Sequence, residues 1–227
     1  MVTRTADFMR RVSAPDPAVL ALIGKADEIT SRILRTAQEQ FELVGIRRTT
    51  MEDVARQCGV GKATLYRRFP TKDAVVDAVV LSEVQRYLDG NAVARSRGDT
   101  FEARLINGVV FTVEFLRNNA LLKKLMSTEP ETLLRSLTVD ASAIIDWASE
   151  SSAALLAAEL LPETTPTEAQ QRNLRTAGEL QTRLVLSFML TPHTTIDLST
   201  PAAVRGYVLD FILPLITGWS GPRKASG

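Results

Sequence analysis

The chain has 227 residues, of which 45% are hydrophobic and 23% charged, as in a globular protein of one or two domains. Its single cysteine (Cys58) and single histidine (His193) exclude an internal disulfide and a zinc site with the usual ligands. No apolar run reaches the ~18 residues of a membrane-spanning helix, and charges interrupt the first residues, so no secretory signal is predicted. We therefore expect a cytoplasmic protein without metal or cofactor.

The net charge of +1 conceals an uneven distribution. Residues 1–72 carry 13 Lys or Arg and 8 Asp or Glu, a net charge of +5. Residues 73–227 carry 14 and 18, a net charge of −4. A basic N-terminal part on an acidic remainder is typical of a DNA-binding segment joined to a body that avoids DNA.

Residues 1–26 are predicted to form a flexible N-terminal arm, because Pro15 and Pro17 forbid a continuous helix. Its arginines could follow DNA phosphates or enter a minor groove, as basic arms of other DNA-binding proteins do. The simpler interpretation, which we favour, is an unstructured tail with incidental charge.

The first predicted helix covers residues 27–44, where apolar residues recur at helical spacing, and Gly45 ends it. In the loop that follows, Arg47 and Arg48 are expected near a phosphate backbone, with plain solvated charge as the alternative. Thr50 is a candidate N-cap for the next helix, and its hydroxyl or that of Thr49 could reach a phosphate.

Residues 50–69, TMEDVARQCGVGKATLYRRF, predict two short helices joined by a tight turn. Ala55 is small enough for two helices that cross closely, and Gly59 can take a positive φ where the chain reverses. Three apolar side chains would fill the wedge between the helices: Val54, Val60 and Leu65. This pattern indicates a helix-turn-helix, whose second helix lies in the major groove of DNA.

The second helix of this motif is predicted over residues 62–69, with Leu65 and Phe69 facing inward. Arg67 would then face outward and could pair with guanine edges, whereas the hydroxyls of Thr64 and Tyr66 could donate to phosphates. The predicted DNA-binding residues are Arg47, Arg48, Thr49, Thr50, Lys62, Ala63, Thr64, Tyr66, Arg67 and Lys72. The alternative is a solvated basic helix pair packed on a core.

The segments 49–55 and 59–73 closely resemble the TetR family of bacterial transcriptional regulators, and the resemblance covers about residues 27–78. Its most specific part is the Tyr-x-x-Phe-Pro-x-Lys segment that begins at Tyr66. One departure is Gly61, where the family usually has serine, so the helix start lacks a side-chain cap. The C-terminal remainder of the family is divergent, and resemblance there is in architecture only.

The resemblance implies an all-α fold of about nine helices. An N-terminal three-helix DNA-binding domain (27–72, with its helix-turn-helix at 50–69) would precede a ligand-binding and dimerisation domain (73–217) and a C-terminal tail (218–227). Helical periodicity supports further helices, with a break at residues 96–99 and a bend or break near residues 149–152 in one of them. Their predicted ranges are 71–94, 100–118, 120–126, 131–161, 167–190 and 201–217.

The resemblance also implies a pocket in the C-terminal domain for a mostly apolar ligand. The candidate lining residues are Phe111, Phe115, Met126, Trp147 and Phe188. The same side chains are equally suited to a solid core, which we favour for any single one of them.

The last two long helices of this family typically pair with their symmetry mates as a four-helix bundle, which implies a homodimer. The predicted interface residues are Leu184, Val185, Phe188, Val204, Tyr207, Val208 and Phe211. The alternative is that these apolar faces close only the core of one chain. The function expected from the resemblance is that of a homodimeric repressor, released from a palindromic operator by a small molecule.

The sequence disfavours two other functional classes. An enzyme is disfavoured, because Arg56 stands where a phosphate-binding loop needs its first glycine and Ala63 where it needs Ser or Thr. The spacing around Ser220 does not fit a nucleophile elbow, and His193 is expected to be a surface histidine. A dimeric interaction protein whose head no longer binds DNA is disfavoured by the polar outer face of residues 62–69.

Overall fold

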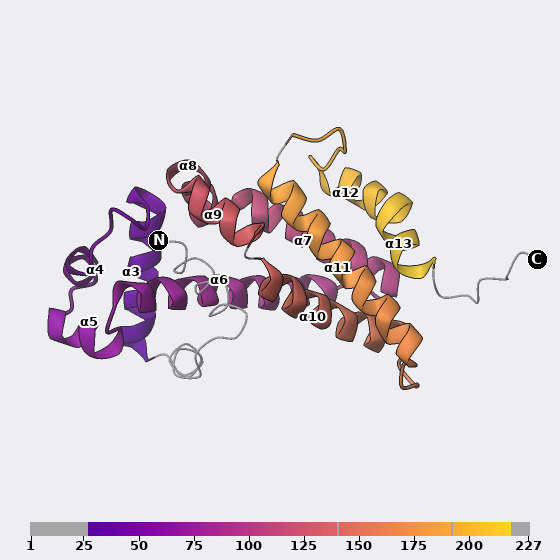
Figure 1. The fold of residues 1–227 in the computed structure, drawn as a ribbon, viewed down its shortest axis with the longest axis horizontal. Coiled ribbons are helices and arrows are strands. Elements are labelled where there is room, and N and C mark those ends of the chain that lie inside the picture. Colours follow the sequence, from indigo (N-terminus) through magenta and orange to yellow (C-terminus); the bar gives the residue numbers. More distant parts are fainter. Residues whose placement is uncertain (1–26, 140, 192, 219–227) are drawn as a thin grey trace, which may run out of the picture. The chain divides into compact units, whose positions relative to one another are not determined.

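Helices make up the regular structure of the part of the chain that the computed structural model describes, residues 27–139, 141–191 and 193–218 (Figure 1). No strand occurs within these residues, which confirms the predicted all-α class. The predicted arm (1–26) and nearly all of the predicted tail (218–227) lie outside the described residues. Within the described residues, two compact units can be distinguished, residues 27–87 with 118–143 and residues 88–117 with 144–218.

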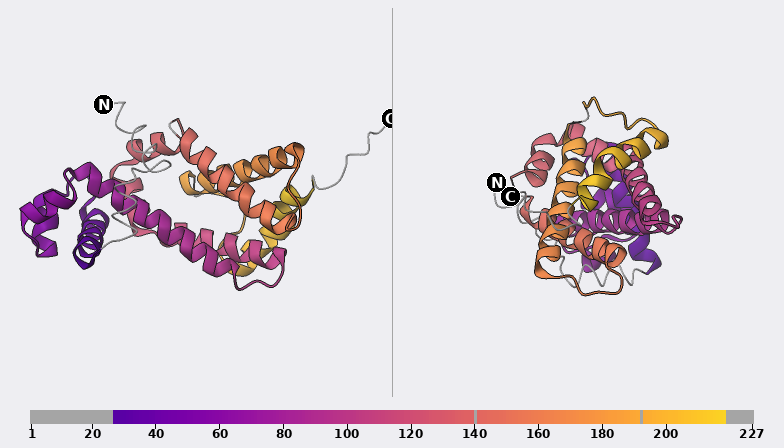
Figure 2. Two further views of the ribbon diagram at one scale, coloured as in Figure 1. Left: turned by 90° about the horizontal axis from the view of Figure 1, so that it is seen from below. Right: turned by 90° about the vertical axis from the view of Figure 1, so that its right-hand side faces the viewer.

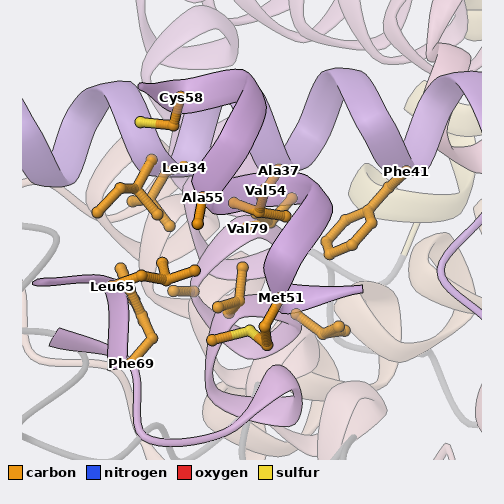
Figure 3. Close-up of a cluster of buried hydrophobic side chains, with 14 of the residues drawn as sticks. Leu34, Ala37, Phe41, Met51, Val54, Ala55, Cys58, Leu65, Phe69 and Val79 are labelled. Carbon is orange, nitrogen blue, oxygen red and sulfur yellow. The ribbon is translucent and has the colours of Figure 1, made fainter. Parts of the chain in front are cut away.

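The first unit contains α3 (Glu28–Val44), α4 (Met51–Cys58), α5 (Lys62–Arg68) and the N-terminal part of α6 (Lys72–Arg95). It also contains α8 (Ala120–Thr128) and α9 (Pro130–Leu137), which follow much later in the chain. A single apolar core joins α3, α4, α5, α6 and α8, and Figure 3 labels ten of its side chains. Leu121 of α8 is part of this core, with 4% of its surface exposed, so α8 helps to support the two short helices of the motif.

The second unit contains the rest of α6, α7 (Phe101–Asn118), α10 (Ser142–Leu160), α11 (Glu168–Leu190) and a last helix made of α12 (Pro201–Tyr207), a π turn (Val208–Ile212) and α13 (Leu213–Thr217). α10 and α11 lie side by side (Figure 2). Leu174 of α11 and Val208 of the last helix are almost completely buried in the core of this unit. None of the described helices is long and apolar enough to span a membrane.

Local signals in the sequence account for most helix ends. The side chains of Asp27, Thr50 and Thr167 accept hydrogen bonds from backbone N–H groups three residues later, and the last two complete capping boxes. Gly45 and Gly59 end α3 and α4 with φ values of 91° and 69°, a region in which a side chain would be strained. The predicted N-cap Thr50 and the predicted positive φ of Gly59 are thereby confirmed.

The predicted helix over residues 131–161 is wrong in one respect. The break falls between Leu137 and Ser142, not near residues 149–152, so the described chain has ten helices where about nine were expected. The hydroxyl of Ser149 donates to the Ile145 carbonyl at 2.6 Å, within a continuous α10. A Cβ on Gly178 of α11 would lie 2.8 Å from the Ser149 carbonyl oxygen, so the small residues here allow two helices to pack closely.

The last helix winds more widely over Val208–Ile212, where the Leu213 N–H donates to the Val208 carbonyl, five residues earlier. Pro214 follows at once, and its ring has no N–H for the Asp210 carbonyl and would clash with it in a regular α-helix. A π turn relieves this clash, because it spaces the carbonyls further from the ring.

The predicted boundary between the DNA-binding domain (27–72) and the C-terminal domain (73–217) divides the chain by function. It therefore stays a prediction. The grouping of residues 118–143 with the N-terminal helices was not anticipated. Its cause is visible in the contacts of α8, which packs on α3 and places Lys124 so that its ammonium donates to the Leu43 carbonyl at 2.6 Å.

Candidate nucleic-acid interface

The second helix of the motif, α5, has two different faces. Leu65 and the following Phe69 are 0% and 3% exposed and anchor the helix in the core of the first unit (Figure 3). The helix ends at Arg68, one residue earlier than predicted, because Phe69 precedes Pro70 and takes an extended conformation with φ −127° and ψ 93°. Gly61 is the N-cap and offers no side-chain hydrogen bond, as its identity predicts.

The opposite face of α5 is open to solvent. Lys62, Ala63, Tyr66 and Arg67 are exposed and Thr64 is partly exposed. Tyr66 is a large side chain with 41% of its surface exposed. The structure therefore brings together on one face all five α5 residues that were predicted to meet DNA.

Lys62 forms an exposed ion pair with Glu52 of α4, with 3.2 Å between Nζ and Oε1. A backbone N–H and the Lys62 ammonium lower the pKa of Glu52 below its usual value. The carboxylate therefore stays charged and neutralises Lys62 in the absence of DNA. A phosphate at Lys62 would have to compete with this pair.

The loop before α4 divides the remaining predicted contacts. Arg47 and Arg48 are exposed, whereas Thr49 is 2% exposed and its hydroxyl donates to the Gly45 carbonyl at 2.9 Å. Thr49 therefore stabilises the loop from inside, and its place among the phosphate contacts is corrected. The buried position follows from the turn after Gly45, which the sequence pattern alone did not define.

Thr50 is exposed, but its hydroxyl already serves the capping box. It donates to the Asp53 carboxylate at 2.6 Å and accepts from the Asp53 N–H at 3.1 Å. Hydrogen bonds from Thr50 and then from Arg56 lower the pKa of Asp53. A hydroxyl has one proton, which Thr50 already donates to Asp53, so this hydroxyl has no proton left for a phosphate. A phosphate near Thr50 would instead accept from the first backbone N–H groups of α4.

Lys72, at the first position of α6, is partly buried, and its ammonium donates to the Arg47 carbonyl at 3.2 Å. The predicted phosphate-binding lysine thus also ties the loop of Arg47 to the start of α6. An ammonium has three donors, so this bond leaves donors for a phosphate.

A further arginine, Arg68, has a structural role that the sequence pattern did not predict. Its guanidinium holds both carboxylate oxygens of Asp27, the N-cap of α3, at 2.7 and 2.6 Å. These bonds, followed by those from Thr30, lower the pKa of Asp27 from 3.8 to about 2. Nothing in the spacing of two residues 41 positions apart signals this pair, which fixes the end of α5 to the start of α3.

The predicted ligand-binding residues are divided between the units. Met126 belongs to the first unit, and Phe111, Phe115, Trp147 and Phe188 belong to the second. The rings of Phe111 and Phe115 lie 5.8 Å apart, and Phe111 packs on Gly90 so closely that a Cβ there would lie 2.3 Å from its ring. Phe111 therefore packs tightly against α6, as a core side chain does.

The predicted dimer residues all belong to the second unit, where they differ in burial. Val204 and Val208 are 2% and 0% exposed, so their side chains close the core of one chain and are not available to a partner. Phe211 is 64% exposed and stacks on Tyr207, whose ring meets Phe188 edge to face; both ring pairs have centroids 6.0 Å apart. Leu184 and Val185 are partly exposed. The available part of the predicted interface is thus centred on Phe211.

Taken together, the fold and this face define an all-α protein with a helix-turn-helix at its N-terminal side. The family profile of bacterial regulatory proteins of the tetR family matches residues 33–79, and that of the bacterial tetracyclin repressor C-terminal domain matches residues 101–205. The chain belongs to the TetR family. Members of this family are transcriptional regulators and not enzymes. Among the described residues, no three His, Cys, Asp or Glu side chains are grouped so as to hold a metal ion.

Individual relatives match over part of their length. The HTH-type transcriptional regulator UidR of Escherichia coli strain K12 is 29% identical over 108 residues, 45% of this chain and 53% of UidR. An uncharacterised HTH-type transcriptional regulator of Mycobacterium bovis is 28% identical over 111 residues, 49% of this chain and 57% of that protein. The chain therefore spans about half the length of the relatives that it matches.

Solved structures show the same fold over most of the chain. The TetR family repressor AlkX from Dietzia sp., implicated in biodegradation of n-alkanes, has a TM-score of 0.58 at 21% identity, covering 82% of this chain and 97% of AlkX. A transcriptional regulator from Cytophaga hutchinsonii has a TM-score of 0.56 at 20% identity, covering 85% and 98%. Sequence identity this low supports the architecture alone.

Proposed function

We propose that the chain is a transcriptional regulator that binds duplex DNA with α5 in the major groove. The observation that carries this proposal is the division of α5 into a face anchored by Leu65 and Phe69 and a solvent-exposed face with Tyr66 and Arg67. A helix held from one side, with polar side chains on the other, is the geometry of a recognition helix.

The residues of this surface, which we call the DNA face, fall into two groups. Arg67 is exposed one residue before the end of α5 and is the side chain suited to guanine edges. Arg47, Arg48, Lys62, Thr64, Tyr66 and Lys72 surround it with groups that donate to phosphates. The first group would select the sequence and the second would fix the protein on the duplex.

More specifically, we propose that the chain is a cytoplasmic protein that forms a homodimer and represses transcription. Two copies related by a two-fold axis would place two α5 helices on half-sites about 34–36 Å apart, which implies a palindromic operator. The exposed Phe211, continuous with the rings of Tyr207 and Phe188, supports a partner surface on the second unit. The repressor activity is that named for AlkX, the structural neighbour.

The same proposal includes a mostly apolar small-molecule effector bound by the C-terminal domain. Its support is the three partly buried rings of Phe111, Phe115 and Phe188 in the second unit, whereas the predicted Trp147 is exposed. The n-alkane context named for AlkX agrees with an apolar compound. The effector would bind more tightly to a form whose two α5 helices are wrongly spaced for the operator. It then lowers DNA affinity by the same factor by which DNA lowers the affinity for the effector.

The decisive experiment is selection of bound duplexes from a random DNA pool with the full-length protein, followed by footprinting. We expect an enriched inverted repeat and protection of both half-sites. Compounds that release the protein from this repeat would then be sought among apolar metabolites. Protein that ignores every duplex at low ionic strength would overturn the proposal and favour a dimeric interaction protein.

A further inference from the structure

A buried carboxylate lies directly behind the DNA face. Glu129 occupies the junction of α8 and α9, where it is the C-cap of one helix and the N-cap of the other. Its side chain is 7% exposed, and its Oε1 accepts the backbone N–H of Arg47 at 2.9 Å. Its Oε2 lies 3.7 Å from the Arg47 Nε. A carboxylate so deeply buried is rare unless hydrogen bonds use it.

The junction approaches the loop closely at a second point. Gly45, with φ 91°, lies against Thr128, where an added Cβ would be 3.2 Å from the Thr128 Oγ1 and 3.7 Å from the Glu129 Oε1. One turn earlier, the Lys124 ammonium donates to the Leu43 carbonyl. The last turn of α8 therefore holds the end of α3 and the start of the loop together.

The loop is also held from its other side. The Arg47 carbonyl accepts from Lys72 at 3.2 Å, so Glu129 and Lys72 fix the N–H and the C=O of one residue. Thr49, two residues later, is buried and bonded to the Gly45 carbonyl. The backbone between these points is thus determined, and the exposed side chains of Arg47 and Arg48 leave it in defined directions.

We propose that Glu129 is a positioning residue for DNA binding. By fixing the Arg47 N–H, it orders the loop 45–50 before DNA arrives, so that Arg47 and Arg48 meet phosphates in the register that α5 sets. An ordered loop does not lose that conformational freedom on binding, which raises affinity without a contact of its own. The inference rests on the proposed DNA binding and names a residue outside the predicted DNA-binding domain that serves it.

The test compares three variants of the full-length protein with the parent. Glu129→Ala removes the acceptor, Glu129→Gln keeps an oxygen for the Arg47 N–H without the charge, and Glu131→Ala removes an exposed carboxylate of the next turn. Two quantities are measured: hydrogen exchange of the Arg47 amide without DNA, and affinity for the selected duplex as a function of salt.

We expect Glu129→Ala to speed exchange of the Arg47 amide and to lower DNA affinity about tenfold, with a shallower salt dependence, because ordered phosphate contacts are lost. Glu129→Gln should retain most of both properties, and Glu131→Ala should match the parent. If Glu129→Ala does not fold, Glu129→Asp is used instead. Its side chain is shorter by one methylene, so its carboxylate should no longer reach the Arg47 N–H, and we expect the same faster exchange and lower affinity.

Three outcomes would overturn the inference. Unchanged exchange at Arg47 in Glu129→Ala would show that the carboxylate does not order the loop. Faster exchange with unchanged affinity and salt dependence would show that the order does not serve DNA binding. Parent protein that binds no duplex would overturn the proposed function as well, and exchange at Arg47 would still report the anchoring, so the two failures can be told apart.

Discussion

Arg67 and Lys72 lie five positions apart, yet their surroundings give them different parts on the DNA face. Arg67 projects from α5 into solvent, whereas Lys72 is partly buried and bonded to the Arg47 carbonyl. We expect Arg67→Ala to weaken binding to the selected operator by ~1–3 kcal/mol and to relax preference at one base pair. Lys72→Ala should weaken binding to all duplexes and reduce the salt slope by at least about 1, because it removes a phosphate donor and also releases the Arg47 carbonyl. Anisotropy titrations on the operator and its single-base variants measure both effects.

The matched control for these substitutions is Arg172→Ala, which removes an arginine of the second unit whose side chain is 71% exposed. It should leave DNA affinity and the salt slope unchanged. If Arg67→Ala lowered affinity for all base variants equally, Arg67 would be a phosphate contact and the assignment of base reading to it would be wrong.

Among the helices, the orientation of α5 depends on its attachment at both ends. At its C-terminal end the Arg68 guanidinium holds Asp27 and keeps the pKa of that carboxyl at about 2, below the ordinary 3.8. A lowered pKa contributes stability that is fully present above pH ~3.8 and is lost as the pH falls through about 2, because both states are protonated below that pH. Asp27 is exposed, so solvent limits the size of this contribution.

The pH dependence is tested with Asp27→Asn, Arg68→Gln and the double variant. Asparagine caps a helix about as well as aspartate, so the cap itself is retained. The coupling free energy between the two positions, measured by urea unfolding, should be present at neutral pH and should have lost most of its size at pH 2. A coupling that is independent of pH would contradict an ion pair.

At its N-terminal end, α5 follows two glycines with different requirements. Gly59 has φ 69°, whereas Gly61 has φ −66° and open space where a Cβ would stand. We expect Gly59→Ala to lower the free energy of unfolding by ~1–2 kcal/mol, because a side chain is strained at this φ. Gly61→Ser should raise it by a few tenths of a kcal/mol by supplying the missing cap. Equal effects of the two changes in urea unfolding would refute this distinction.

The sequence predicted the helices whose ends carry local signals. Caps such as Thr50 and Thr167 and turn glycines such as Gly59 act through neighbours a few residues away, so their chemistry is readable in one dimension. The misplaced break shows the limit of this approach. Ser149 suggested an interruption, but it bonds within its own helix and faces the close approach of Gly178 from another one.

The site was predictable to a similar depth. The outer face of α5 follows from helical periodicity, because Leu65 and Phe69 fix which side is inward. The polar supports behind it were not predictable: Glu129 meets Arg47 across 82 positions, and Arg68 meets Asp27 across 41. Such pairs obey no period, and only the packing of the helices of the first unit in three dimensions brings them within hydrogen-bond distance.

For the whole molecule, binding to a palindrome depends on pairing of two copies. Phe211 is the large exposed side chain within the predicted interface, so we expect Phe211→Asp to yield monomers in light scattering. Operator affinity should then fall at least ~100-fold, since one half-site no longer assists the other. The control is Val139→Asp, which alters a 75% exposed valine of the first unit and should leave the dimer intact. A dimeric mass for Phe211→Asp would place the interface elsewhere.

The π turn of the last helix also sets the phase of the helix surface. Its buried residues recur every fourth position, at Val204, Val208, Ile212 and Ile216. In a regular α-helix, three such steps would carry the stripe about 120° around the axis, and the wider turn removes part of that drift. A π turn accommodates one extra residue, so loss of one residue here would restore regular winding and leave the later side chains close to their present orientation. An ungapped alignment with a relative that lacks the π turn would therefore assign the wrong face beyond Ile212.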